Sequence, residues 1–242
     1  MEIHESEDHE FVDIHIERRR VIWISAVVLA GIIALLVLTM DKVRELGERI
    51  VTPREYIPPK SIPKGIEIPD VYDIKGYAAA SPKAFDRFLA KQDFREIFAR
   101  LQHFLYINEV DGVVPSFQLL RQGSDWQTID EPPFALPPEE SWESMVNTLR
   151  LLQEEIVPRI GPVTVLSGWR TDRYNAKAGG SKTSKHMHFC GLDMVPERDF
   201  TREELLPILR DIHRKQGKKW NMGLGIYKGV RFHVDTCGYR RW

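Results

Sequence analysis

The residues best suited to chemistry lie in the last third of the chain. His186, Asp193 and His233 are residue types that bind zinc. Three such protein ligands leave the fourth position of a tetrahedral ion to water, as in a catalytic zinc site rather than a closed structural one. A second acid, Asp235, follows His233 by two residues and gives the site a proton acceptor. These residues indicate a metallohydrolase.

The spacing of the histidines leaves a rival ligand set open. His233 and Asp235 are two residues apart on a predicted strand, so both side chains point to the same face. One of them can then bind the metal while the other approaches a metal-bound water. His186 and His188 have the same spacing, and an H-x-H pair of ligands is therefore the rival assignment.

The elements that must position these residues indicate an α+β domain. Apolar residues at helical spacing follow a Ser81-Pro82 helix start and run to Leu105, and a second helix is predicted over about 139–156. The capping box Thr201-x-x-Glu204 predicts a third helix over about 202–216. Short strands are expected at 163–166 and 189–195 and, around a turn at 228–229, within 223–235. Helices followed by a small, mostly antiparallel sheet are typical of an α+β fold.

The N-terminal part predicts a membrane anchor. Residues 21–40 carry no charge, and about 20 apolar residues suffice to span a bilayer. Three arginines, residues 18–20, precede this segment and favour a cytoplasmic N-terminus by the positive-inside rule. We therefore expect a cytoplasmic tail over 1–20, a single transmembrane helix over 21–40, and a juxtamembrane segment with a Pro-rich linker over 41–76. The domain that follows would lie on the periplasmic or extracellular side of the cytoplasmic membrane.

Charge and cysteine content add two expectations. The 242 residues carry a formal net charge of −1 at pH 7, which argues against nucleic acid as the main partner. The two cysteines, Cys190 and Cys237, lie close to the candidate metal ligands in sequence. In an oxidising compartment they can form one disulfide, and a pair of free buried thiols is the alternative.

Several motifs together resemble one family. They are Gly179-Gly180-x-x-x-Ser184-x-His186, then Asp193 seven residues later, then His233-Val234-Asp235 and a terminal Arg241-Trp242. This pattern resembles the M15 peptidases, which are zinc D-alanyl-D-alanine carboxypeptidases and murein endopeptidases in a superfamily that includes the hedgehog domain. The segment from Ser167 to Asn175 resembles the family's S-G-Y-R-S-x-x-Y-N motif. The resemblance spans about 134–242, so we expect an M15-like zinc peptidase domain over 136–242 and a helical accessory region over 77–135.

The resemblance implies a role for each matched residue. It places Zn²⁺ on His186, Asp193 and His233. It makes Arg170 the cation that holds the substrate's carboxylate or carbonyl oxygen and stabilises the oxyanion, and it places Ser184 and Asn175 at the substrate.

Asp235 inherits the role of general base, because Val230 occupies the position three residues before the last histidine where some branches carry it. Its alternative role is to accept a hydrogen bond that orients His233. The chain departs from the family pattern at Phe189, where glycine is usual, and at Gly191, where alanine is usual. We expect these changes to alter the wall of the cleft.

The expected function is that of a membrane-anchored zinc metallopeptidase that hydrolyses peptidoglycan stem peptides or cross-links. The alternative is a zinc-containing binding or scaffold module at the cell envelope, without turnover. A third hypothesis is hydrolysis of peptides unrelated to the cell wall.

Overall fold

The computed structural model describes residues 35, 69–91 and 93–242. The chain divides into Met1–Thr52 and Pro53–Trp242, and the helices and strands with bounds given below all lie in the second unit. The expected cytoplasmic tail, the transmembrane helix apart from Leu35, and most of the linker lie outside the described residues. Within the described part of the chain, no helix has the length and apolar character needed to cross a bilayer.

A short β-hairpin opens the described domain. β1 (Val71–Ile74) pairs antiparallel with β2 (Tyr77–Ala80). The two-residue turn between them has φ of 53° at Lys75 and 84° at Gly76, and hairpin turns of this kind favour glycine. The strands of this hairpin begin at Val71, ahead of the linker boundary expected at residue 76.

Helices form where the sequence predicted them, but the stretch from Ser81 to Leu105 is divided into two helices, and a helix over 172–177 was not predicted. The helices are α2 (Pro82–Leu89), α3 (Phe94–Ile107), α4 (Trp142–Leu151), α5 (Val157–Ile160), α6 (Asp172–Lys177) and α7 (Arg202–Gln216). The Ser81 hydroxyl caps α2 by accepting a hydrogen bond from the Ala84 N–H, and Thr201 and Glu204 form the predicted capping box of α7. A π-helical segment, η3 (Leu152–Ile156), joins α4 to α5, so the helix predicted over 139–156 continues to Ile160.

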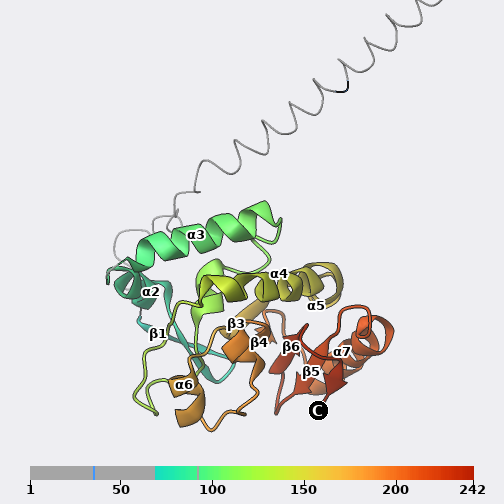
Figure 1. Cartoon of the computed structure of the whole chain (residues 1–242). Helices are drawn as coiled ribbons and strands as arrows, with labels where there is room; N and C mark the ends of the chain where they lie inside the picture. Colours follow the sequence, from blue (N-terminus) through green and yellow to red (C-terminus); the bar gives the residue numbers. More distant parts are fainter. Residues whose placement is uncertain (1–34, 36–68, 92) are drawn as a thin grey trace, which may run out of the picture. The chain divides into compact units, whose positions relative to one another are not determined.

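A five-stranded sheet carries the candidate site. Its strands are β3 (Val163–Ser167), β4 (Gly191–Pro196), β5 (Gly223–Ile226), β6 (Phe232–Asp235) and β7 (Arg240–Arg241). The spatial order is β3-β4-β6-β5-β7, and each pair is antiparallel except β5 and β7. Figure 1 shows α4 and α5 crossing this sheet, with α7 beside β5. The mostly antiparallel sheet with flanking helices confirms the α+β prediction.

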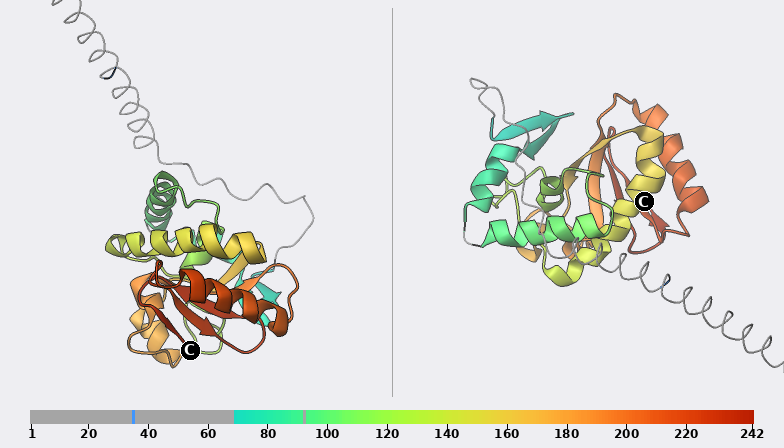
Figure 2. Two further views of the ribbon diagram at one scale, coloured as in Figure 1. Left: turned by 90° about the vertical axis from the view of Figure 1, so that its right-hand side faces the viewer. Right: turned by 90° about the horizontal axis from the view of Figure 1, so that it is seen from above.

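One hydrophobic core joins the helices of 82–160 to the sheet. Figure 2 shows the green and yellow helices of this range beside the orange and red strands. A buried arginine strengthens this connection. Arg121 donates to the Ala80 carbonyl through Nε and Nη2, at 3.1 and 2.8 Å, and to the Val165 carbonyl through Nη1 at 2.6 Å. Burial lowers its pKa to about 10. The region expected to be accessory, 77–135, thus shares its core with the sheet and is tied to it by buried hydrogen bonds.

Candidate metal centre

The sheet brings two of the expected ligands directly opposite each other. Ser167, Asp193 and His233 are register partners across β3, β4 and β6, so their side chains share one face of the sheet. His233 Nδ1 lies 2.9 Å from Asp193 Oδ1. This pairing follows from strand register and not from sequence proximity.

The third expected ligand comes from a separate turn. His186 lies in η4 (Lys185–His188), and its Nε2 is 3.4 Å from Asp193 Oδ1. One ligand atom from each of His186, Asp193 and His233 lies within 4.8 Å of the other two, and all three residues are buried. Ligands about 2.0–2.1 Å from a tetrahedral zinc ion are separated by roughly 3.3 Å, so the spacing fits one ion. His188 lies outside this group, although the sequence left it open as a rival ligand.

A backbone hydrogen bond sets the orientation of the His186 ring. Its Nδ1 is 2.9 Å from the Gly168 carbonyl oxygen, to which it donates, and Nε2 is therefore left with its lone pair toward Asp193. Burial lowers the pKa of His186, which favours the neutral form that a metal ligand requires. The donor set and its tautomer thus suit a metal ion.

Asp235 binds the opposite edge of the His233 ring. Its Oδ2 is 2.9 Å from His233 Nε2, while Nδ1 faces Asp193. Arg240 donates to both carboxylate oxygens at 3.0 and 2.7 Å, and the Cys237 N–H donates to Oδ1 at 2.9 Å. Burial alone would raise the pKa of Asp235, but hydrogen bonds from His233 and Arg240 outweigh it and lower the pKa. The carboxylate is fully buried, and both of its oxygens already accept hydrogen bonds on the side of the His233 ring that is opposite Asp193.

Two neighbours of Asp193 were not identified from the sequence. Arg231 Nη2 lies 2.6 Å from Asp193 Oδ2, and the Tyr227 hydroxyl lies 3.3 Å from Oδ1. Burial alone would raise the pKa of Asp193, but the neighbouring His186 and His233 hold it well below its usual range. The available signal for Arg231 was its position two residues before His233, which places both side chains on the same strand face.

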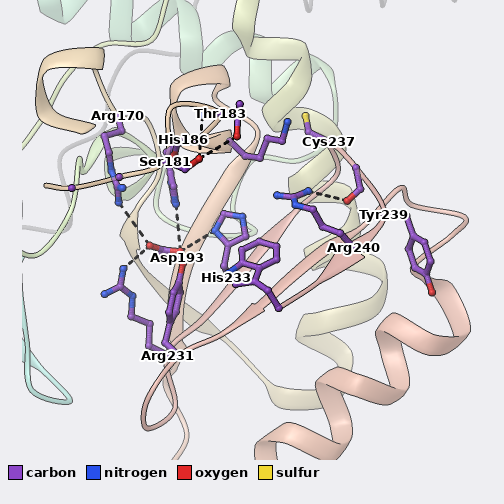
Figure 3. Close-up of a pocket in the computed structure, with 17 residues that line it drawn as sticks. Arg170, Ser181, Thr183, His186, Asp193, Arg231, His233, Cys237, Tyr239 and Arg240 are labelled. Carbon is purple, nitrogen blue, oxygen red and sulfur yellow. Dashed lines mark hydrogen bonds and ion pairs between the residues drawn. The ribbon is translucent and has the colours of Figure 1, made fainter. Parts of the chain in front are cut away.

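Arg170 is held near Asp193 by the segment before the sheet. It donates through Nε to the Gln122 carbonyl at 3.0 Å and through Nη2 to Ser167 Oγ at 2.9 Å. Its Nη2 is 3.8 Å from Asp193 Oδ2. Figure 3 shows Arg170, His186, Arg231 and His233 converging on Asp193. A fixed guanidinium in this position can stabilise negative charge on a bound substrate.

The two other residues expected at the substrate differ in position. Ser184 lines the cavity over the cluster, immediately before η4. Asn175 is only 3% exposed and does not line that cavity; its Nδ2 donates to the Ser181 carbonyl at 2.9 Å. A Cβ on Gly180 would lie 2.1 Å from Asn175 Oδ1, so the loop passes close over this side chain. Asn175 thus contacts the loop at residues 180–181, and its expected contact with the substrate stays a prediction.

The departures from the family pattern have structural counterparts. Phe189 has a left-handed φ of 48°, which favours glycine, but its ring is fully buried and lies edge-on to Trp169. A Cβ on Gly191 would lie 2.6 Å from His233 Cε1, so glycine leaves room for the ligand ring. Between them, Cys190 forms a disulfide with Cys237, as the sequence predicted for an oxidising compartment, and the two cysteines are not a pair of free thiols.

A cavity of about 680 Å³, here called the metal cavity, lies over the cluster. Besides the three candidate ligands, its wall includes Arg170, Ser184, Tyr227, Arg231, Tyr239, Arg240 and Trp242. This volume is within the range of small-molecule and cofactor sites. The arrangement can hold a metal ion beside an extended polar ligand.

The comparison with protein families agrees with this geometry. Residues 118–235 match the family model described as Peptidase M15. These residues form a peptidase M15 domain. The chain matches no curated protein and no solved structure. The M15 match begins at residue 118, inside the region expected to be accessory, and therefore includes Gln122, which holds Arg170 in place.

Proposed function

We propose that this M15 domain is a zinc-dependent peptidase that hydrolyses peptide bonds in peptidoglycan stem peptides or cross-links. The observation that carries the proposal is the buried His186–Asp193–His233 cluster at the metal cavity, with the His186 tautomer set by the Gly168 carbonyl. When bound there, zinc would polarise the scissile carbonyl and lower the pKa of a coordinated water toward about 7.

The chain's own residues would position the substrate and the ligands. Arg170 would hold developing negative charge on the substrate oxygen, because Gln122 and Ser167 fix its guanidinium at the edge of the metal cavity. Asp235 would hold the His233 ring, and we assign it this positioning role in place of the general base expected from the resemblance. The reason is that both of its oxygens already accept hydrogen bonds at the far side of the ring. Ser184 would contact the substrate from the loop.

The hydrogen bonds that already engage both Asp235 oxygens also favour a second candidate function. This candidate is a zinc-containing binding or scaffold module without turnover. If Asp235 does not take the proton, no other aspartate or glutamate among the described residues of the cavity wall replaces it except the ligand Asp193. Such a module would bind zinc and stem peptides but release no product.

The decisive experiment is product analysis of purified murein incubated with the full chain, with metal content measured in parallel. His186→Ala should abolish both zinc binding and product release. The matched control is His188→Ala, which removes a histidine two residues away that lies outside the cluster. Zinc binding without product in the unmodified protein would support the scaffold module, and full hydrolysis by His186→Ala would rule out the ligand assignment.

The sequence also leads us to propose that residues 21–40 anchor the chain in the cytoplasmic membrane, with the M15 domain on the outer side. Support comes from the uncharged 20-residue segment and the preceding arginines. Fractionation and protease accessibility of intact cells against spheroplasts test this: a protein found in the soluble fraction would refute it.

A further inference from the structure

A second cavity lies beside the metal cavity and shares part of its wall. This cavity of about 650 Å³, here called the arginine cavity, is lined by α7 and the C-terminal segment. Its wall includes Arg210, Asp211, Arg214, Tyr239, Arg240 and Arg241. Tyr239 and Arg240 line both cavities, so the two cavities are adjacent.

Packing fixes the shared wall. The Tyr239 ring stacks on His213 of α7, with centroids 4.8 Å apart and an interplanar angle of 8°. The His213 Nε2 lies 3.0 Å from the Arg240 carbonyl oxygen. In Figure 3, Tyr239 and Arg240 lie on the side of the metal cavity that leads toward a neighbouring helix. The junction between the two cavities is thus built from contacts within the domain.

The arginine cavity carries positive charge that the protein does not neutralise. The single acid in its wall, Asp211, already pairs with Arg159, Arg214 and Lys215. Arg210 and Arg241 are exposed and form no ion pair within the described part of the chain. Arginine presents a planar fork of N–H donors that matches a carboxylate or a phosphate.

We propose that the arginine cavity is a subsite for a carboxylate of the same peptide whose scissile bond lies at the metal cluster. This rests on the proposed function, because it takes the ligand of the metal cavity to be a peptide. The adjacency of the two cavities at Tyr239 and Arg240 favours a group on that peptide over an unconnected anion. Arg210 and Arg241 bind the carboxylate, while Arg240 stays paired with Asp235 and forms the bridge between the cavities.

The test compares two synthetic stem peptides, one with free carboxylates on its non-terminal residues and one with these carboxylates amidated. Hydrolysis and equilibrium binding are measured with the full chain, the double variant Arg210→Ala/Arg241→Ala, and the control Lys218→Ala/Lys219→Ala. The control removes the same charge from exposed residues just after α7 that line neither cavity. The arginine variant should raise KM for the carboxylate peptide roughly tenfold with kcat nearly unchanged, as expected when two solvent-exposed charge pairs are lost. The KM for the amidated peptide should be the same in the unmodified protein and in the arginine variant.

Binding separates failure of this inference from failure of the proposed function. If no peptide is hydrolysed, tighter binding of the carboxylate peptide that disappears in the arginine variant still supports the subsite. Equal KM and equal affinity for the two peptides in the unmodified protein would overturn the carboxylate subsite. An equal rise in KM for the carboxylate peptide in the lysine control would overturn it as well. Competition by inorganic phosphate alone, without discrimination between the peptides, would instead assign the cavity to a phosphate ligand and refute the carboxylate.

Discussion

The assignment of Asp235 can be tested by the isosteric change Asp235→Asn. The carboxylate accepts one hydrogen bond from His233 Nε2, two from Arg240 and one from the Cys237 N–H. The amide of asparagine can still accept from His233 through its oxygen, but it loses the charge that pairs with Arg240. Outer partners of metal-bound histidines typically contribute 10–100-fold in metal affinity. That range corresponds to about 1.4–2.8 kcal/mol.

The assay separates metal affinity from turnover. Zinc affinity is measured by competition with a chromophoric chelator, and hydrolysis of stem peptides is measured at saturating zinc. We expect Asp235→Asn to bind zinc 10–100-fold more weakly and to recover turnover within a few-fold once the site is saturated. Asp199→Asn, an exposed aspartate paired with Lys75, is the matched control and should change neither quantity.

A general base gives the opposite pattern. Loss of a general base costs about 10²–10⁴-fold in rate, and added zinc cannot restore it. Normal zinc affinity with a persistent loss of turnover at saturation would therefore refute the positioning role of Asp235. Thermal unfolding of the metal-free variant, compared with the metal-free parent, separates either result from a general loss of folding.

Two further predictions concern the residues around the ligands. Gly191→Ala, which introduces the residue usual in the family, should weaken zinc binding in a titration, because its Cβ would lie 2.6 Å from His233 Cε1; unchanged affinity would show that the ring shifts freely. Replacing Cys190 and Cys237 together by serine removes a cross-link between residues 47 apart, for which the loop-entropy estimate is about 4 kcal/mol. Denaturant unfolding should show that the free energy of unfolding falls by an amount of that order. An unchanged unfolding midpoint would contradict this prediction.

Local signals in the sequence were sufficient for much of the fold. The Ser81-Pro82 start, the Thr201–Glu204 capping box and the strand near residues 163–166 are all present in the structure. Each depends on residues a few positions apart, which interact regardless of the rest of the chain. The group of His186, Asp193 and His233 was also expected, because residue types and the family pattern restrict where zinc ligands can lie.

The remaining features depend on contacts that spacing does not determine. Strand period places Asp235 and His233 on one face, but it does not say which ring nitrogen each carboxylate meets. Gln122 reaches Arg170 across 48 positions, and the buried Arg121 joins β2 to β3. Such long-range contacts follow from the packing of the whole domain, so local patterns in the sequence could not predict them.

The three candidate ligands differ in how firmly the backbone presents them. Asp193 and His233 face each other across paired strands, so the pairing of β4 with β6 is enough to bring these two candidate ligands together. His186 comes from a 3₁₀ turn, and its ring is aligned by contacts of Nδ1 with the Gly168 carbonyl at 2.9 Å and with Ser167 Oγ at 3.4 Å. The position of His186 therefore depends on the turn, whereas the positions of Asp193 and His233 depend on the strand pairing.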